Sequence, residues 1–108
     1  MAKLRTKDPV ATMAAETASM LKAVADRDRL TIIDSLRGGP KNVGQLAKIL
    51  RAEIVNVSHH LGVLRKRKLV TFEKRGRFVS YSLNPDVYRD TAQGETLVLG
   101  NCKLLIGK

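Results

Sequence analysis

Residues 42–64, NVGQLAKILRAEIVNVSHHLGVL, contain two short runs of apolar residues at helical spacing. Asn42 and Gln45 form an N-x-x-Q variant of the capping box, which starts the first helix. A brief turn over residues 51–53 leads into the second helix. The apolar faces of the two helices are Val43, Leu46, Ala47 and Leu50, followed by Ile54, Val57, Leu61 and Leu64. The spacing predicts two helices joined by a tight turn.

Two more helices are predicted before this pair. Pro9 suits the first position of a helix over residues 9–25. Asp26 or Asp28 caps the next helix, which stops at the Gly-Gly-Pro of residues 38–40. The apolar face of that second helix is Leu30, Ile33 and Leu36.

The helix over residues 9–25 has an apolar face that is broader than the surface helix of a monomer needs. Small residues on this face would allow another helix to approach closely. Two interpretations stay open: the face is one side of the monomer core, or it is core and also a subunit interface. The candidate interface residues are Val10, Met13, Ala14, Thr17, Ala18 and Leu21.

The spacing of apolar residues changes after residue 68. Residues 69–74 and 77–83 are rich in β-branched and aromatic side chains, and Arg75-Gly76 lies between them. This pattern predicts a β-hairpin with a basic tip.

Two further elements are predicted near the C-terminus. Asn84-Pro85 is a helix-start signal, and the helix it opens is short because Gly94 lies close behind. Residues 96–106 are strand-like, either as a small hairpin or as one bulged strand. Such an apolar segment needs a partner surface, which we expect to be a second subunit.

This order predicts a mainly α fold with a small β-hairpin. We expect a winged helix-turn-helix of order α-α-α-α-β-β-α with a strand-like C-terminal tail. The expected divisions are a basic N-terminal arm over residues 1–8, a DNA-binding and dimerisation domain over residues 9–95, and the tail over residues 96–108.

The chain carries a formal net charge of +10 over 108 residues. Such a surplus favours a polyanionic partner, either nucleic acid or an acidic membrane surface. Residues 51–77 contain eight basic and two acidic residues, which is more than half of the excess charge. Because this segment coincides with the predicted helix-turn-helix and hairpin, we expect double-stranded DNA to be the partner.

Composition also weighs against several functional classes. No run of about 18 apolar residues is present, so we expect no membrane span. The basic N-terminus leads into no apolar segment, so we expect no secretory signal. The single cysteine, Cys102, excludes an intramolecular disulfide and favours a reducing cytoplasm. Phosphate-binding loops and hydrolase motifs are missing, so we expect no enzyme activity.

The second helix of the central pair carries short polar side chains opposite its apolar stripe. Such groups can hydrogen-bond base edges in a major groove, whereas cations suit phosphates or a minor groove. The expected base readers are Asn56, Ser58 and His59. The expected backbone or wing contacts are Arg65, Lys66, Arg67, Lys74, Arg75 and Arg77. For His60, a packed histidine and a DNA contact both stay open.

Residues 21–30 read LKAVADRDRL, residues 57–64 read VSHHLGVL, and residues 76–83 read GRFVSYSL. In this order they resemble the L-x-A-L-A-D-x-x-R-L segment, the recognition helix and the wing of ArsR/SmtB-type transcriptional repressors. The resemblance covers roughly residues 13–84. It implies a homodimer, joined through its first and last helices, that binds a palindromic operator and releases it when an effector binds.

The chain departs from that family's sensors at their metal-binding positions. Lys41, Asn42 and Val43 stand where arsenic and cadmium sensors carry cysteines. Residues 84–108 contain no histidine, unlike the last helix of the zinc and nickel sensors. We therefore expect no metal site at these positions and no cofactor, and the effector stays unknown.

Three other residues bear on metal binding and redox sensing. His59 and His60 are adjacent on a helix, so they point about 100° apart and do not share one ion comfortably. Cys102 remains a candidate for redox chemistry.

Two alternative functions stay open beside the repressor. A sequence-blind architectural protein would bind all duplexes of one length equally. A winged-helix protein-interaction module would not need the basic segment, since protein interfaces deplete charge at their centre.

Overall fold

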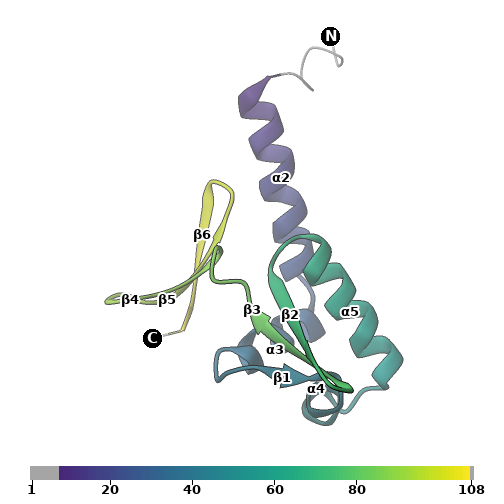
Figure 1. The fold of residues 1–108 in the computed structure, drawn as a ribbon. Helices are drawn as coiled ribbons and strands as arrows, with labels where there is room; N and C mark the ends of the chain where they lie inside the picture. The colour runs from purple at the N-terminus through teal and green to yellow at the C-terminus, as the bar shows by residue number, and fades with distance from the viewer. Residues whose placement is uncertain (1–7, 108) are drawn as a thin grey trace.

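Helices form the first half of the structure, and strands form the second half (Figure 1). The computed structural model describes residues 8–107. The predicted basic arm over residues 1–8 therefore lies, except for Asp8, outside the described residues. The helices are α2 (Pro9–Val24), α3 (Arg27–Leu36), α4 (Val43–Leu50) and α5 (Ile54–Lys66). None of them has the length and hydropathy that crossing a bilayer requires.

Side-chain caps fix where the helices start. Asp26 caps α3, since its carboxylate accepts a hydrogen bond from the backbone N–H of Arg29 at 3.0 Å. Asn42 and Gln45 form both hydrogen bonds of the predicted capping box, each 2.9 Å long. The side chain of Glu53 makes no capping hydrogen bond at the start of α5.

The strands form two antiparallel sheets, each with three strands within the described residues. One sheet, the wing, has the order β1-β3-β2, and the other, the C-terminal sheet, has the order β4-β5-β6. The bounds are β1 (Lys41–Asn42), β2 (Val70–Arg75), β3 (Phe78–Leu83), β4 (Tyr88–Thr91), β5 (Gly94–Leu99) and β6 (Cys102–Gly107). The wing confirms the predicted hairpin, although its turn lies at Gly76-Arg77, one residue later than expected, and β1 was not predicted.

The predicted short helix between Asn84 and Gly94 is wrong. One helical turn does form, because the N–H of Tyr88 donates to the carbonyl of Asn84 at 2.9 Å. The chain then extends into β4, which pairs along its whole length with β5. Strand pairing with β5 therefore overrides the local helix signal, and the order of elements ends in three strands instead of a helix.

The tail confirms the hairpin alternative and not the single bulged strand. β5 and β6 pair in an antiparallel hairpin that turns at Gly100-Asn101, with a register shift between Glu95 and Thr96. The division expected between residues 95 and 96 therefore falls inside β5. Gly94 starts this strand with φ +128°, and a Cβ there would collide with the backbone carbonyl of Gly107.

The core is aliphatic and includes part of the C-terminal sheet. Leu97 and Leu99 of β5 are fully buried in the same cluster as the helices. The largest fully buried side chains are Ile32, Ile33, Leu46, Val57, Leu61, Leu64, Leu69, Val70, Leu97 and Leu99. One face of the tail is thus covered by its own chain, which corrects the expectation that only a second subunit would cover it.

Two residues of the predicted apolar faces are exposed instead. Leu30 is 45% exposed and Ile54 is 59% exposed. Both lie near the start of their helices, and Ile32 takes the place of Leu30 on the buried face of α3. The spacing of apolar residues in the sequence does not show which residue of an apolar stripe is the first to be buried.

A polar cluster fastens the C-terminal sheet to the helical part. The guanidinium of Arg37, just after α3, donates to the carboxylate of Glu95 on β5 at 2.6 and 3.1 Å. The hydroxyl of Tyr88 on β4 donates to the other oxygen of Glu95. The Arg37 contact holds the pKa of Glu95 below its usual range, and the Glu95 carboxylate raises the pKa of Tyr88 to about 12.

This cluster predicts a loss of stability at alkaline pH. The pKa of Tyr88 is raised from 10.0 to about 12, so its stabilising contribution is complete below pH 10 and disappears between pH 10 and about 12. The free energy of unfolding should therefore fall more steeply over that range in the wild type than in Tyr88→Phe, which cannot ionise there. Urea unfolding of both proteins across the range measures this difference, and parallel curves would contradict it.

Candidate nucleic-acid interface

Helix α5 has one buried face and one exposed face. Val57, Leu61 and Leu64 point into the core and are almost completely buried. The three expected base readers are all exposed on the remaining surface of the helix: Asn56, Ser58 and His59. The structure therefore presents these polar side chains together, on a helix whose opposite side is fixed by packing.

The junction between α4 and α5 holds the two helices at a fixed angle. Arg51 ends α4 in the left-handed region with φ 53°, which turns the chain sharply. The N–H of Ala52 then donates to the carbonyl of Ala47 at 3.1 Å, which closes the helix end. This tight turn matches the predicted helix-turn-helix geometry.

The structure supports the packed interpretation of His60. Its side chain is only 16% exposed, and its Nε2 lies 3.5 Å from a carboxylate oxygen of Asp28. Its Nδ1 lies 3.2 Å from Nη1 of Arg29, whose Nε donates to the carbonyl of Ala23 at 2.6 Å. His60 therefore links α5 to the corner between α2 and α3, and it is not one of the exposed residues expected to read bases.

The same corner brings together three groups of the type that ligate metals. Ligand atoms of Asp26, Asp28 and His60 lie within 4.8 Å of one another. Arg29 already pairs with this group: its Nη1 contacts His60 and lies 3.9 Å from a carboxylate oxygen of Asp26. The Nε of Arg27 lies 3.9 Å from a carboxylate oxygen of Asp28, so each carboxylate has an arginine partner, and we assign the cluster a role in packing.

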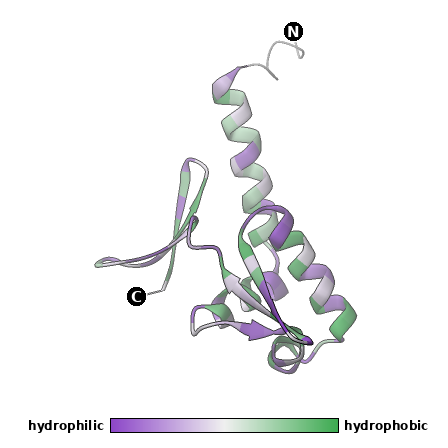
Figure 2. Ribbon diagram, viewed as in Figure 1, coloured by the Kyte–Doolittle hydropathy of each residue, from purple (hydrophilic) through white to green (hydrophobic). Residues whose placement is uncertain are grey.

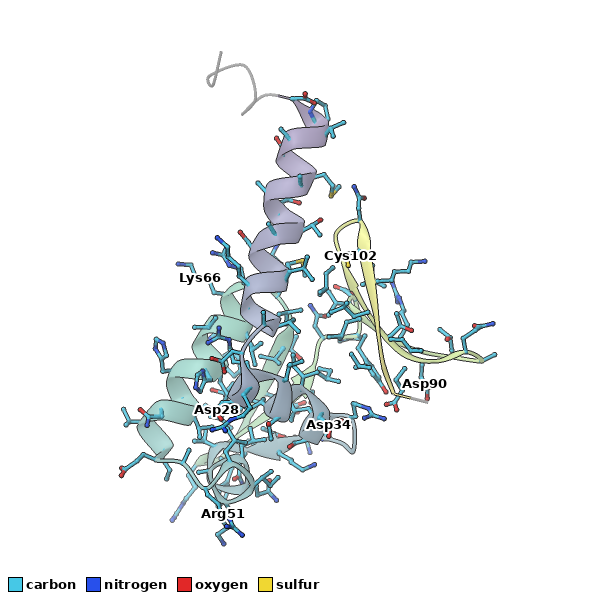
Figure 3. The ribbon with its side chains drawn as sticks, turned by 180° about the vertical axis from the view of Figure 1, so that it is seen from behind. Asp28, Asp34, Arg51, Lys66, Asp90 and Cys102 are labelled. Carbon is cyan, nitrogen blue, oxygen red and sulfur yellow. The ribbon has the colours of Figure 1, made fainter. Side chains whose placement is uncertain are left out.

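Cations surround the exposed face of α5 at its C-terminal end. Arg65, Lys66 and Arg67 are all exposed there, and Figure 3 labels Lys66 where this end of the helix approaches α2. The guanidinium of Arg65 lies over the ring of Phe72 on β2, 4.0 Å from the ring centre. This stacking fixes the position of one cation between the helix and the wing.

The cations at the wing tip differ in how they are paired. Lys74, Arg75 and Arg77 are exposed, as expected. Arg75 donates to the carboxylate of Glu73 at 2.7 Å, and this contact raises the pKa of Arg75. Within residues 8–107, Lys74 and Arg77 have no such carboxylate partner. The unpaired cations are therefore the better candidates for phosphate contact.

The expected dimer residues lie on a helix that extends beyond the rest of the fold. Figure 2 shows hydrophobic residues along the projecting part of α2. Val10 is 77% exposed, and Thr17 accepts a hydrogen bond from the N–H of Asn101 at 3.2 Å. Of the other expected interface residues, Ala14 and Ala18 are exposed and Met13 and Leu21 are half-buried. The β5–β6 turn thus covers part of this face, and the rest is open.

Two residues lie outside the expected DNA-contact and dimer sets: Cys102, the redox candidate, and Val55. Cys102 is half-buried on β6 and packs beside the core, where Figure 3 labels it next to α2. Val55 is 71% exposed in the first turn of α5. Sequence patterns do not single out Val55, because an apolar residue outside the apolar stripe carries no polar signal.

Comparison with known proteins finds relatives across the helix-turn-helix. A family model described as bacterial regulatory protein, arsR family, matches residues 26–71. The transcriptional repressor SdpR of Bacillus subtilis is 33% identical over 73 residues, which cover 68% of this chain and 81% of SdpR. The regulator NmtR of Mycobacterium tuberculosis is 46% identical over 70 residues, which cover 65% of this chain and 58% of NmtR.

Solved structures share the same architecture. A homodimeric winged helix-turn-helix DNA-binding domain from Mycobacterium bovis gives a TM-score of 0.69 at 26% identity and covers 73% of each chain. HlyU from Vibrio cholerae gives a TM-score of 0.63 at 34% identity, over 66% of this chain and 75% of HlyU.

The fold, the exposed helix and these relatives define a winged helix-turn-helix transcriptional regulator. The chain belongs to the ArsR family of bacterial regulatory proteins. This result confirms the resemblance seen in the sequence. The family consists of DNA-binding regulators and not of enzymes, as expected.

Proposed function

We propose that the protein is a homodimeric repressor that binds a palindromic operator in the cytoplasm. In this proposal α5 lies in the major groove, where Asn56, Ser58 and His59 contact base edges. The wing and the C-terminal end of α5 contact phosphates or the minor groove. We propose that the effector is not a metal at the usual sites of the family, because Lys41, Asn42 and Val43 offer no thiolate and residues 84–108 contain no histidine.

One observation carries this proposal: between Asn56 and Gly62 the exposed face of α5 carries neutral polar side chains, and cations lie at its C-terminal end and on the wing. Base edges present hydrogen-bond donors and acceptors, which short neutral polar side chains at the centre of a helix can match. Cations at the margin suit the phosphates on either side of a groove. A sequence-blind binder would gain more from cations at the centre, so this face favours a reader over the architectural alternative.

Support for the dimer comes from the shape of α2 and from a relative. The projecting, apolar part of α2 leaves side chains such as Val10 exposed, and the Mycobacterium bovis domain is homodimeric. A two-fold dimer presents two α5 helices to two half-sites about one helical turn apart.

Hydroxyl-radical footprinting on the DNA upstream of the gene tests this proposal. We expect two protected patches, symmetric about their centre and roughly 10 base pairs apart. Uniform protection of the whole duplex would contradict a palindromic operator and favour the architectural alternative. No protection at any protein concentration would favour the protein-interaction module.

The wing gives a prediction about salt dependence. Replacing Lys74 by alanine removes one unpaired cation, so the slope of log affinity against log salt concentration should become shallower by about one unit on any duplex. The matched control is Lys103→Ala, which removes the same charge from an exposed position on β6. Titrations at several salt concentrations measure both slopes. Equal slopes in the two variants would show that the wing does not touch phosphate.

A further inference from the structure

The most outward line of helix α5 begins with an apolar residue. Val55, His59 and Gly62 are spaced by four and then three residues, so they follow one another along the same side of the helix. All three are exposed, and this side lies opposite the buried residues Val57 and Leu61. Val55 therefore lies at the N-terminal end of the face that we propose to enter the major groove.

The surroundings of Val55 leave its side chain free to make a contact. It is 71% exposed, and its neighbour Ile54 is 59% exposed, so the first turn of α5 presents two adjacent apolar side chains. Gly62 lies farther along the same line, and a Cβ built on it would meet nothing within 4 Å. On this line the exposed His59 lies between Val55 and Gly62, and the helix carries no side chain at Gly62.

The chemistry of Val55 selects one kind of base. An isopropyl group has no hydrogen-bond donor or acceptor, so it cannot replace water at the polar edges of guanine, cytosine or adenine. The 5-methyl group of thymine is the apolar group that base pairs display in the major groove. We propose that Val55 reads the methyl group of one thymine in each operator half-site. The inference rests on the proposed function, because it needs α5 to lie in the groove.

The expected effect is modest and specific. Burying one methyl group against an apolar side chain corresponds to about a fourfold change in affinity for each contact. Both half-sites of a palindrome contribute, so the two contacts together correspond to roughly a fifteenfold change when their effects add.

A thymine-to-uracil scan of the footprinted duplex tests the inference. Each symmetric pair of thymines is replaced by deoxyuridine, which removes the methyl group and keeps the base pair and the phosphates. In the wild type, we expect one pair to weaken binding roughly fifteenfold. In Val55→Ala, binding to the unmodified duplex should be weaker by a similar factor and should no longer respond to uracil at that pair.

Ile54→Ala serves as the matched control. It removes a neighbouring exposed apolar side chain, and it should keep the wild-type response to uracil. Thermal unfolding of both variants checks that the helix is intact, and we expect little change because both side chains are exposed.

Two results would overturn the inference while leaving the proposed function standing. One is a wild type that prefers the native duplex over a scrambled one but responds to uracil at no position. The other is a Val55→Ala variant that keeps the full wild-type response. A wild type that binds native and scrambled duplexes equally would instead overturn the proposed function as well.

Discussion

Replacing Leu97 by alanine is expected to lower the free energy of unfolding by about 2–5 kcal/mol. Leu97 is fully buried in the common core, although it comes from β5 near the C-terminus. The substitution removes apolar contacts and leaves a cavity beneath helices that lie far away in the sequence. Urea unfolding at one fixed protein concentration measures the change, because the stability of a dimer depends on concentration.

Leu105→Ala is the matched control for this experiment. Leu105 lies on β6 of the same sheet and is 55% exposed. Its replacement should change the free energy of unfolding by at most about 0.5 kcal/mol. If the two variants were equally stable, the C-terminal sheet would not be part of the core.

Replacing Ser58 or His59 by alanine is expected to cost about 1–3 kcal/mol of binding free energy on the operator. The loss on a scrambled duplex should be much smaller, because base contacts supply discrimination and phosphate contacts supply general affinity. Both side chains are exposed on α5, so the fold should not change. Fluorescence anisotropy titrations onto the two duplexes give both numbers.

Lys66→Ala is the matched control for the base readers. Lys66 lies on the same helix, and its loss should weaken binding to both duplexes by a similar factor. Equal losses on both duplexes for Ser58→Ala and His59→Ala would contradict their assignment as base readers.

Local signals were enough to predict the elements that position the site. The capping box of Asn42 and Gln45 formed as predicted, and its two hydrogen bonds lie within a few residues. The β2–β3 hairpin of the wing was predicted for the same reason, since its two strands lie next to each other in the sequence and pair across a tight turn. The exposure of the expected base readers followed from the spacing of the apolar stripe on α5.

Features that depend on contacts outside their own segment could not be predicted from local patterns. The helix expected after Asn84 gave way to β4 because strand pairing with β5 competes with the local turn. The packing of His60 depends on Arg29, which is 31 residues away in the chain. The link between Arg37 and Glu95 spans 58 residues, so no local pattern could reveal it. The sequence therefore indicated strands over β5 and β6, but it indicated neither β4 nor the place of the sheet against the core.

The central claim is that the neutral polar face of α5 reads DNA sequence. The most direct test is anisotropy of the purified protein on the footprinted duplex and on a scrambled duplex of equal length, each at two salt concentrations. The proposed function predicts a strong preference for the native duplex that persists at the higher salt concentration. Equal affinities that fall together as salt rises would contradict it and would show that the protein responds to charge alone.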